Sequence, residues 1–334
     1  MSTDTTTELL VRAQRLESDG VLSLLLEHPD GAELPAWTPG AHIDVILPSG
    51  TVRQYSLCSD PAEKTQYRIA VLNDPNSRGG SREIHETVRT GTLLPYRGPR
   101  NHFELEPAPH YLLIAGGIGI TPILAMARQI AQGNAGLTVL YGGRTRPSMA
   151  FLDELAALGG TVDVIPQDER GYPDLDGAMT AAPAGTAVYC CGPEPLIRAV
   201  EQACERHLGA DAMHFERFGA PTPPAPGTAG TATAAGPGTP GADEGLAEFE
   251  VELKKSGRTL KVTADRTLLD VVLEANPNIL FSCEEGFCGS CETKVLAGIP
   301  DHHDTILSKT DREKNNTMML CVGRSKTPLL VLDA

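Results

Sequence analysis

The sequence predicts a multidomain protein with three folded parts: an antiparallel β-barrel, a doubly wound α/β domain and a small α+β domain. Three observations lead to this prediction. The 334 residues exceed what one hydrophobic core usually serves. Short strands fill residues 8–106, whereas strands and helices alternate over residues 110–210. A stretch built almost entirely of Ala, Pro, Gly and Thr then sets off a last segment.

The composition excludes several classes of protein. Hydrophobic residues make up 41% and charged residues 21%, as in a folded globular chain. The net charge of −15 argues against a nucleic-acid partner. Residues 1–20 lack the pattern of a secretory signal, and the longest apolar stretch, Tyr111–Ala127, has only 17 residues and is broken by Gly and Pro. We therefore expect a cytoplasmic protein without a membrane partner.

The first predicted domain covers residues 1–108. Its apolar and polar residues alternate over short runs, which is typical of strands with one buried face. One helix is expected at Ser81–Arg89. The expected strands are Leu9–Leu16, Val21–Leu26, His42–Leu47, Thr51–Leu57 and Tyr67–Leu72. Many short strands joined by Gly and Pro turns favour an antiparallel barrel.

The second predicted domain covers residues 109–218. Alternating strands and helices of this kind are typical of a parallel, doubly wound sheet. The expected strands are Leu112–Ala115, Leu137–Gly142, Thr161–Pro166 and Ala187–Cys190. The expected helices are Pro122–Gln132, Phe151–Leu158 and Glu194–Leu208.

Residues 219–245 form the clearest boundary, because 25 of these 27 residues are Ala, Pro, Gly or Thr. A stretch without apolar periodicity cannot pack, so we interpret it as a linker; the alternative is a long surface loop inside one domain. In the third predicted domain, residues 246–334, a hairpin is expected from Glu248–Lys254 and Thr259–Ala264, followed by a helix at Thr267–Ala275.

Four of the eight cysteines lie in the last 52 residues, at Cys283, Cys288, Cys291 and Cys321. The first three have the spacing C-x4-C-x2-C, and four thiolates are what a two-iron cluster needs. Gly286 and Gly289 can adopt positive φ and turn backbone amides toward the sulfur atoms. The alternatives are buried free thiols or a zinc site, although zinc prefers paired C-x2-C units.

Two glycine-containing turns of the second domain could hold a nucleotide. Each ends a predicted strand of the same sheet and opens a helix, whose free amides favour a pyrophosphate. The first turn contains Gly116, Gly117, Gly119, Thr121 and Pro122; the second contains Cys191, Gly192 and Pro193. Both are expected at the carboxyl edge of the sheet, where open α/β sheets bind ligands.

Together these two turns resemble the nicotinamide domain of the ferredoxin–NADP reductase superfamily, and the cysteine pattern resembles plant-type ferredoxins. The order of the three domains resembles the phthalate dioxygenase reductase type, which includes vanillate demethylase reductases. The Ser77–Ser81 and Asn101–Phe103 segments look like that branch. The resemblance implies FMN in the barrel, NADH (with NADPH possible) in the α/β domain and a 2Fe-2S cluster on a β-grasp fold.

The resemblance also implies roles for residues of the barrel. Arg53, Tyr55, Ser56 and Leu57 lie on one predicted strand, where Ser56 would hydrogen-bond flavin N5 and Arg53 would hold a phosphate. Alternation puts Arg53, Tyr55 and Leu57 on one face of the strand and Ser56 on the other. Gly79, Gly80 and Ser81 precede a helix and suit a monophosphate; the alternative is a plain turn capped by Ser81.

In the second domain the resemblance places Cys191 near the nicotinamide and an aromatic residue, Phe218, over the flavin. The competing interpretation is that Phe215 and Phe218 pack in the core. Arg144 and Arg146 follow a strand whose end, in this superfamily, holds the adenine-side ribose. They could bind a 2′-phosphate or the pyrophosphate, or remain solvated.

The implied activity is electron transfer. Nicotinamide gives a hydride, which carries two electrons, whereas a 2Fe-2S cluster accepts one, and flavin can do either. Hydride is therefore expected to pass to the flavin, and single electrons to the cluster. The implied acceptor is a terminal oxygenase, of the Rieske type or less often a cytochrome P450. The alternative is an electron carrier or redox sensor that does not turn over NADH.

Overall fold

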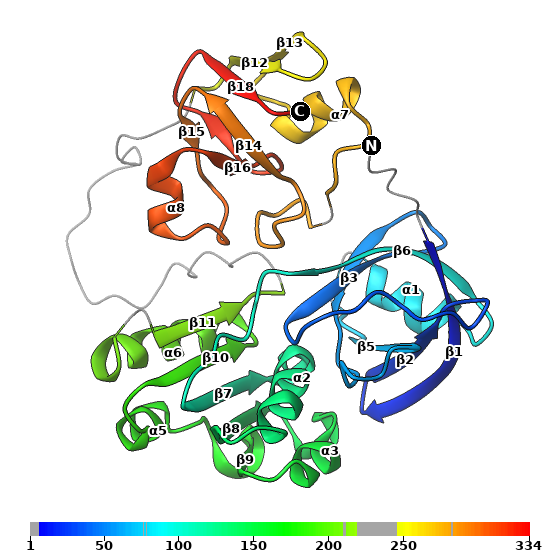
Figure 1. Cartoon of the computed structure of the whole chain (residues 1–334), viewed down its shortest axis with the longest axis vertical. Helices are drawn as coiled ribbons and strands as arrows, with labels where there is room; N and C mark the ends of the chain where they lie inside the picture. The colour runs from blue at the N-terminus through cyan, green and yellow to red at the C-terminus, as the bar shows by residue number, and fades with distance from the viewer. Residues whose placement is uncertain (1–6, 76, 78, 210–211, 219–245, 282) are drawn as a thin grey trace. The chain divides into compact units, whose positions relative to one another are not determined.

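The computed structural model describes residues 7–75, 77, 79–209, 212–218, 246–281 and 283–334. The chain forms two compact units, Met1–Phe218 and Gly219–Ala334. The first unit holds a curled antiparallel sheet and a parallel sheet with helices; the second holds a smaller sheet with two helices (Figure 1). The predicted multidomain fold is confirmed. The predicted linker, residues 219–245, lies outside the described residues.

Six antiparallel strands form the barrel, in the order β4-β3-β6-β1-β2-β5. The two end strands, β4 and β5, contact each other, so the sheet curls around a shared apolar core. The strands are β1 (Thr7–Ser18), β2 (Val21–Glu27), β3 (Ala41–Ile46), β4 (Val52–Ser56), β5 (Gln66–Leu72) and β6 (Leu93–Asn101), and helix α1 spans Gly80–Thr87.

Strand β6 was not predicted, although it lies between β3 and β1 in the sheet. Pro95, Gly98 and Pro99 interrupt the apolar alternation along it. Its pairing with β1, where Leu94 lies opposite Leu9, supplies the order that the local pattern lacks.

The second sheet of this unit is parallel, in the order β11-β10-β7-β8-β9. Because the chain crosses from β9 back to β10, the topological switch point lies between β7 and β10, where open α/β sheets bind ligands. The strands are β7 (His110–Gly116), β8 (Gly136–Gly143), β9 (Thr161–Pro166), β10 (Thr186–Cys191) and β11 (Met213–Glu216). The α-helices are α2 (Ile120–Ala131), α3 (Leu152–Ala157), α4 (Gln167–Arg170), α5 (Leu175–Ala181) and α6 (Glu194–His207), with 3-10 turns η1 (Gly117–Gly119) and η2 (Arg146–Ser148).

The barrel and the parallel sheet share one apolar core. Cys58 and Ala70 of the barrel pack in the same buried cluster as Leu113 and Met126 of the parallel-sheet domain. Two hydrogen bonds also join the parts: Ser18 Oγ donates to the Ser148 carbonyl at 3.2 Å, and the Asp19 amide donates to the Pro147 carbonyl at 2.8 Å. The two parts therefore pack as one unit.

The second unit contains a five-stranded sheet in the order β13-β12-β18-β14-β16, with helix α7 packed on it. The predicted hairpin and helix are confirmed, and a hydrogen bond from the Asp270 amide to Thr267 Oγ1 caps the helix. The elements are β12 (Phe249–Leu253), β13 (Arg258–Val262), α7 (Leu268–Ala275), β14 (Glu292–Ala297), β15 (Pro300–Asp301), α8 (Lys309–Lys314), β16 (Thr317–Met319), β17 (Arg324–Ser325) and β18 (Leu329–Leu332). In the described part of the chain, every helix is too short or too polar to cross a bilayer.

Candidate functional site

The two glycine-containing turns lie side by side at the carboxyl edge of the parallel sheet, as predicted. Strands β7 and β10 pair with Ala115 opposite Cys191. A Cβ atom on Gly116 would come within 2.7 Å of Pro193, and one on Gly119 would overlap the Cys191 carbonyl. Only glycine therefore permits this close backbone contact between the turns.

Three polar side chains, two buried and one partly buried, meet between the barrel and this edge. Glu216, on β11, lies opposite Cys191 in the strand register. Ser56, at the end of β4, donates a hydrogen bond from Oγ to Glu216 Oε2 at 3.4 Å. Ser56 and Cys191 are both buried. Ser56 and Cys191 were predicted from the sequence, whereas Glu216 was not, although it lies between Phe215 and Phe218.

Burial determines the ionisation of the Glu216 carboxyl group and the Cys191 thiol. It raises the pKa of Glu216 to about 8, against a smaller opposing effect of the Ser56 hydrogen bond. Burial, followed by the nearby Glu216, also raises the pKa of the Cys191 thiol well above its usual value. At neutral pH the three side chains are thus mainly uncharged, and the carboxyl group can donate as well as accept a hydrogen bond.

The barrel strand β4 presents its side chains as the alternation predicts. Tyr55 and Leu57 pack with the barrel core on one face, whereas Ser56 reaches Glu216 on the other. Arg53 lies against Gly80, where an added Cβ would come within 2.8 Å of the guanidinium Nε. The strand and the start of helix α1 are therefore adjacent.

Helix α1 begins at Gly80, and its N-cap is Gly79 with φ of 91°. Ser81 is thus inside the helix and does not cap it; its hydroxyl instead lies 2.8 Å from Ser77 Oγ. The interpretation of this segment as a plain turn capped by Ser81 is wrong. Arg78, between these residues in the predicted motif, lies outside the described residues.

These surroundings fit the phosphate and ring of a flavin. The cradle of Arg53 and the amides of Gly80 and Ser81 has the chemistry that a phosphate requires. His42, paired across the strands with Ser56, is buried, and its Nε2 atom has no hydrogen-bond partner among the described residues. Burial, and then the charge of Arg100, lower the pKa of His42 to about 3, so the ring is neutral. Such an atom can bond to a polar ring ligand.

The remaining predicted nucleotide residues differ in their surroundings. Pro122 lies in the first turn of α2, and the Thr121 hydroxyl donates to the Ile118 carbonyl at 3.1 Å. Arg146 forms a bidentate ion pair with Glu169, in which Nε donates to Oε1 at 3.2 Å and Nη2 donates to Oε2 at 2.8 Å. Arg144 precedes it in the loop after β8.

Phe218 lies at the end of the described first unit and is 42% exposed, which contradicts the competing interpretation that it packs in the core. Phe215 is partly buried against the core beside β10. The Arg217 guanidinium covers the Phe215 ring at 4.2 Å, and its Nε donates to Glu194 at 2.7 Å. Phe218 is therefore accessible to a ligand, whereas the Phe215 ring is covered by Arg217.

The second unit holds the four predicted ligand cysteines. Cys283, Cys288, Cys291 and Cys321 are all buried and unpaired by disulfides. Their thiols contact one another, Cys283 with Cys288 and Cys321, and Cys321 with Cys291. In the described residues, no three His, Cys, Asp or Glu side chains are spaced to hold a single metal ion. Four buried thiols that contact in pairs have the donor chemistry of a 2Fe-2S cluster.

The backbone around these thiols takes the predicted shape. Gly286 and Gly289 have φ of 76° and 75°, and the Glu285 amide donates to Cys283 Sγ at 3.3 Å. Ser290 Oγ lies 3.4 Å from Cys288 Sγ, and a hydrogen bond at this distance can tune the site. Thr293 Oγ1 donates to the Cys291 carbonyl.

Comparison with known proteins gives this geometry a family. Residues 251–326 match the 2Fe-2S iron-sulfur cluster binding domain, and residues 98–213 match the N-terminal domain of dimethylamine monooxygenase subunit DmmA-like proteins. The chain is 42% identical over 330 residues to phenoxybenzoate dioxygenase subunit beta of Ectopseudomonas oleovorans, covering 97% of this chain and 96% of that protein.

Solved structures match nearly the whole chain. Phthalate dioxygenase reductase, a modular structure for electron transfer from pyridine nucleotides to 2Fe-2S, is 33% identical with a TM-score of 0.70, covering 99% of this chain and 98% of that one. The chain belongs to the phthalate dioxygenase reductase family. A type IV self-sufficient cytochrome P450 monooxygenase is 40% identical with a TM-score of 0.84, covering 98% of this chain but 41% of that one. The predicted family and oxidoreductase class are therefore confirmed.

Proposed function

We propose that this chain is the reductase component of an oxygenase system and passes electrons from NADH through FMN and a 2Fe-2S cluster to a partner oxygenase. The observation that carries the proposal is the meeting of Ser56, Cys191 and Glu216 where the barrel strand adjoins both nucleotide turns. Hydride transfer needs such a contact, because donor and acceptor rings must lie face to face. Membership in the reductase family supports it.

The residues divide between three cofactors. Arg53, Gly79, Gly80 and Ser81 would bind the FMN phosphate, with Tyr55, Ser56 and Leu57 along the rest of the flavin. Gly116, Gly117, Gly119, Thr121, Pro122, Gly192 and Pro193 would form the nucleotide site, and Cys283, Cys288, Cys291 and Cys321 would hold the cluster. When bound, the flavin accepts a hydride from the nicotinamide and releases electrons singly.

Three side chains would border the reacting rings. Ser56 and the neutral Glu216 offer hydrogen bonds at the flavin edge, and the Cys191 thiol fills the space beside the nicotinamide without adding charge. Phe218, which is exposed, would cover the flavin until the nicotinamide replaces it.

The ion pair of Arg146 with Glu169 supports NADH over NADPH. A 2′-phosphate would have to displace the Glu169 carboxylate, which repels it, before it could bind Arg146. Arg144 and Arg146 would then contact the adenine side of NADH. Steady-state kcat/KM for the two nucleotides, and mass analysis of the flavin released by heat, test these two assignments.

Substitution of one cluster ligand tests the order of electron flow. Cys288→Ser should leave reduction of the flavin by NADH intact, because Cys288 lies in the other compact unit. Reduction of cytochrome c, which needs single electrons from the cluster, should be lost. Cys204→Ser, at a buried cysteine outside the cluster loop, is the matched control. Survival of both activities in Cys288→Ser would contradict the proposed order.

The proposed acceptor is a Rieske-type oxygenase, as the dioxygenase named in the closely similar relative suggests. A cytochrome P450 is a second candidate, because the P450 structure contains a segment similar to this whole chain. NADH-dependent product formation with each purified oxygenase type distinguishes them. An electron carrier that does not turn over NADH would give no flavin reduction at all.

A further inference from the structure

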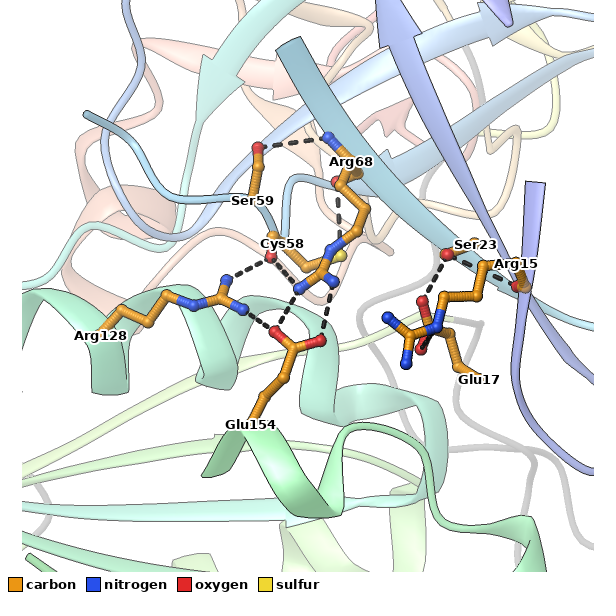
Figure 2. A network of polar contacts seen from close by, with 8 residues as sticks. All are labelled: Arg15, Glu17, Ser23, Cys58, Ser59, Arg68, Arg128 and Glu154. Carbon is orange, nitrogen blue, oxygen red and sulfur yellow. Dashed lines mark hydrogen bonds and ion pairs between the residues drawn. The ribbon is translucent and has the colours of Figure 1, made fainter. Parts of the chain in front are cut away.

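A partly buried carboxylate joins two arginines where the barrel meets the parallel sheet (Figure 2). Glu154 of α3 accepts two hydrogen bonds from Arg68 of β5, at 2.8 Å and 2.7 Å. It also accepts one from Arg128 of α2. The side chains of Arg68 and Arg128 are only 12% and 13% exposed. One carboxylate thus links three elements from both parts of the unit.

Both arginines also bind the backbone of the barrel at the same atom. The Cys58 carbonyl accepts from Arg128 Nη1 at 2.5 Å and from Arg68 Nη2 at 3.1 Å. Cys58 is itself tied to β5, since its amide donates to the Arg68 carbonyl at 2.8 Å. We call Arg68, Arg128, Glu154 and the Cys58 carbonyl the Glu154 clasp.

The clasp connects the two halves of the proposed redox site. Cys58 follows Ser56 by two residues, directly after strand β4. Arg128 lies two turns along helix α2 from Thr121 and Pro122, which begin that helix at the nucleotide edge. A shift of α2 relative to β4 must therefore break hydrogen bonds within the clasp.

The charges of Arg68 and Arg128 stabilise the ionised form of Glu154. Burial opposes ionisation of Glu154, but hydrogen bonds and charge from Arg68 and Arg128 outweigh it and lower the pKa of the carboxyl group. Removing the negative charge would leave two neighbouring guanidinium groups partly desolvated and repelling each other. The hydrogen bonds from Ser18 to Ser148 and from Asp19 to Pro147, which also join the two parts, involve only neutral groups. The clasp is thus the strongest polar link described between them.

We propose that Glu154 and Arg128 are positioning residues for hydride transfer: the Glu154 clasp sets the gap between the flavin strand β4 and the nucleotide helix α2. The inference rests on the proposed function, which places the flavin at Ser56 and NADH at the start of α2. Neither residue touches the reacting rings. Hydride transfer depends steeply on donor–acceptor distance, so a small change in this gap alters the rate.

Single-turnover reduction of the flavin by saturating NADH tests the proposal in the full-length holoprotein. Glu154→Gln should slow this step about 10- to 100-fold, while flavin content and the NADH concentration giving half the maximal rate stay unchanged. The primary isotope effect with deuterated NADH should rise, because the chemical step then limits reduction. Asp176→Asn, which removes an exposed carboxylate paired with Arg206 and His207, is the control and should match the wild type.

Arg128→Lys is a second, milder variant, since lysine keeps the charge but cannot bond the Cys58 carbonyl and Glu154 with one planar group. The double variant should be no slower than the slower single variant, because both break one link. A wild-type reduction rate in Glu154→Gln and Arg128→Lys, or losses confined to thermal stability or flavin content, would overturn the inference. Failure of the wild type to reduce flavin with NADH would instead overturn the proposed function.

Discussion

Glu216 is the residue whose surroundings most change its chemistry. It lies partly buried on β11 beside β10 and Ser56 of the barrel, and burial raises the pKa of its carboxyl group to about 8. A carboxyl group that is neutral at pH 7 can donate a hydrogen bond to a ligand, which a carboxylate cannot. The role of this residue is therefore set by burial and not by residue type.

The pH dependence of flavin reduction should report this group. In the wild type, the rate of flavin reduction by NADH should change near pH 8, as Glu216 loses its proton. Glu216→Gln mimics the protonated form and should lack that inflection. The rate of flavin reduction by NADH, measured by stopped flow over about three pH units from pH 6 to pH 9, tests this prediction. An unchanged inflection in Glu216→Gln would assign it to another group.

The same shift predicts how stability varies with pH. The pKa of Glu216 is raised from 4.5 to about 8 on folding, so the folded protein holds a proton that the unfolded chain has released. Stability from this residue is full below the unfolded pKa and is lost as pH rises through the folded value. Relative to Glu216→Gln, the wild type should lose up to roughly 4 kcal/mol from low to high pH. Urea unfolding of both proteins across that range measures the difference.

At the scale of elements, the cysteine loop depends on a glycine with two constraints. Gly286 has φ of 76°, and a Cβ there would come within 2.6 Å of Val322 and 3.0 Å of the Asp304 backbone. The Thr305 amide also donates to the Gly286 carbonyl at 2.9 Å, which fixes the loop against the segment before α8. The loop therefore has little room to adjust.

Gly286→Ala should lower the amount of bound cluster several-fold. Gly257→Ala is the matched control, because Gly257 has φ of 66° but open space around the added Cβ. Both variants carry the backbone cost of about 1 kcal/mol for positive φ, so their difference isolates the steric contact. Iron and sulfide content per chain is the measurement. Equal loss in the two variants would point to backbone strain alone.

The sequence patterns identified these elements unevenly. The strands of the barrel with clean alternation, β2 and β5, were predicted nearly to the residue. Strand β6, with its Pro and Gly residues, and the short strands β15 and β17 were missed, because their order comes from pairing with distant partners. Local propensity does not report such pairing.

At the scale of the whole molecule, the chain divides into units with separate cores. The buried clusters of the first unit and of the second share no residue. Each unit thus has its own source of hydrophobic stabilisation. The residues proposed to bind the nucleotide and the flavin lie in the first unit, and those proposed as cluster ligands lie in the second.

Residues 1–218 expressed alone should fold, retain flavin and reduce ferricyanide with NADH at a rate near that of the full chain. Reduction of cytochrome c should be lost, since the fragment lacks the cluster ligands. Adding residues 219–334 as a separate chain should restore it only weakly, because the second electron transfer then becomes bimolecular. Cytochrome c reduction by residues 1–218 alone would show that electrons can bypass the cluster.

The sequence by itself determined the family, and it predicted three parts and four cysteine ligands, because spacing, glycine turns and strand alternation are local features of the chain. Only the tertiary structure places Glu216 beside Ser56 and Cys191. It also removes His42 from solvent and brings Arg68, Arg128 and Glu154 together in the Glu154 clasp. These residues are far apart along the chain, and their charge states depend on the solvent that folding removes.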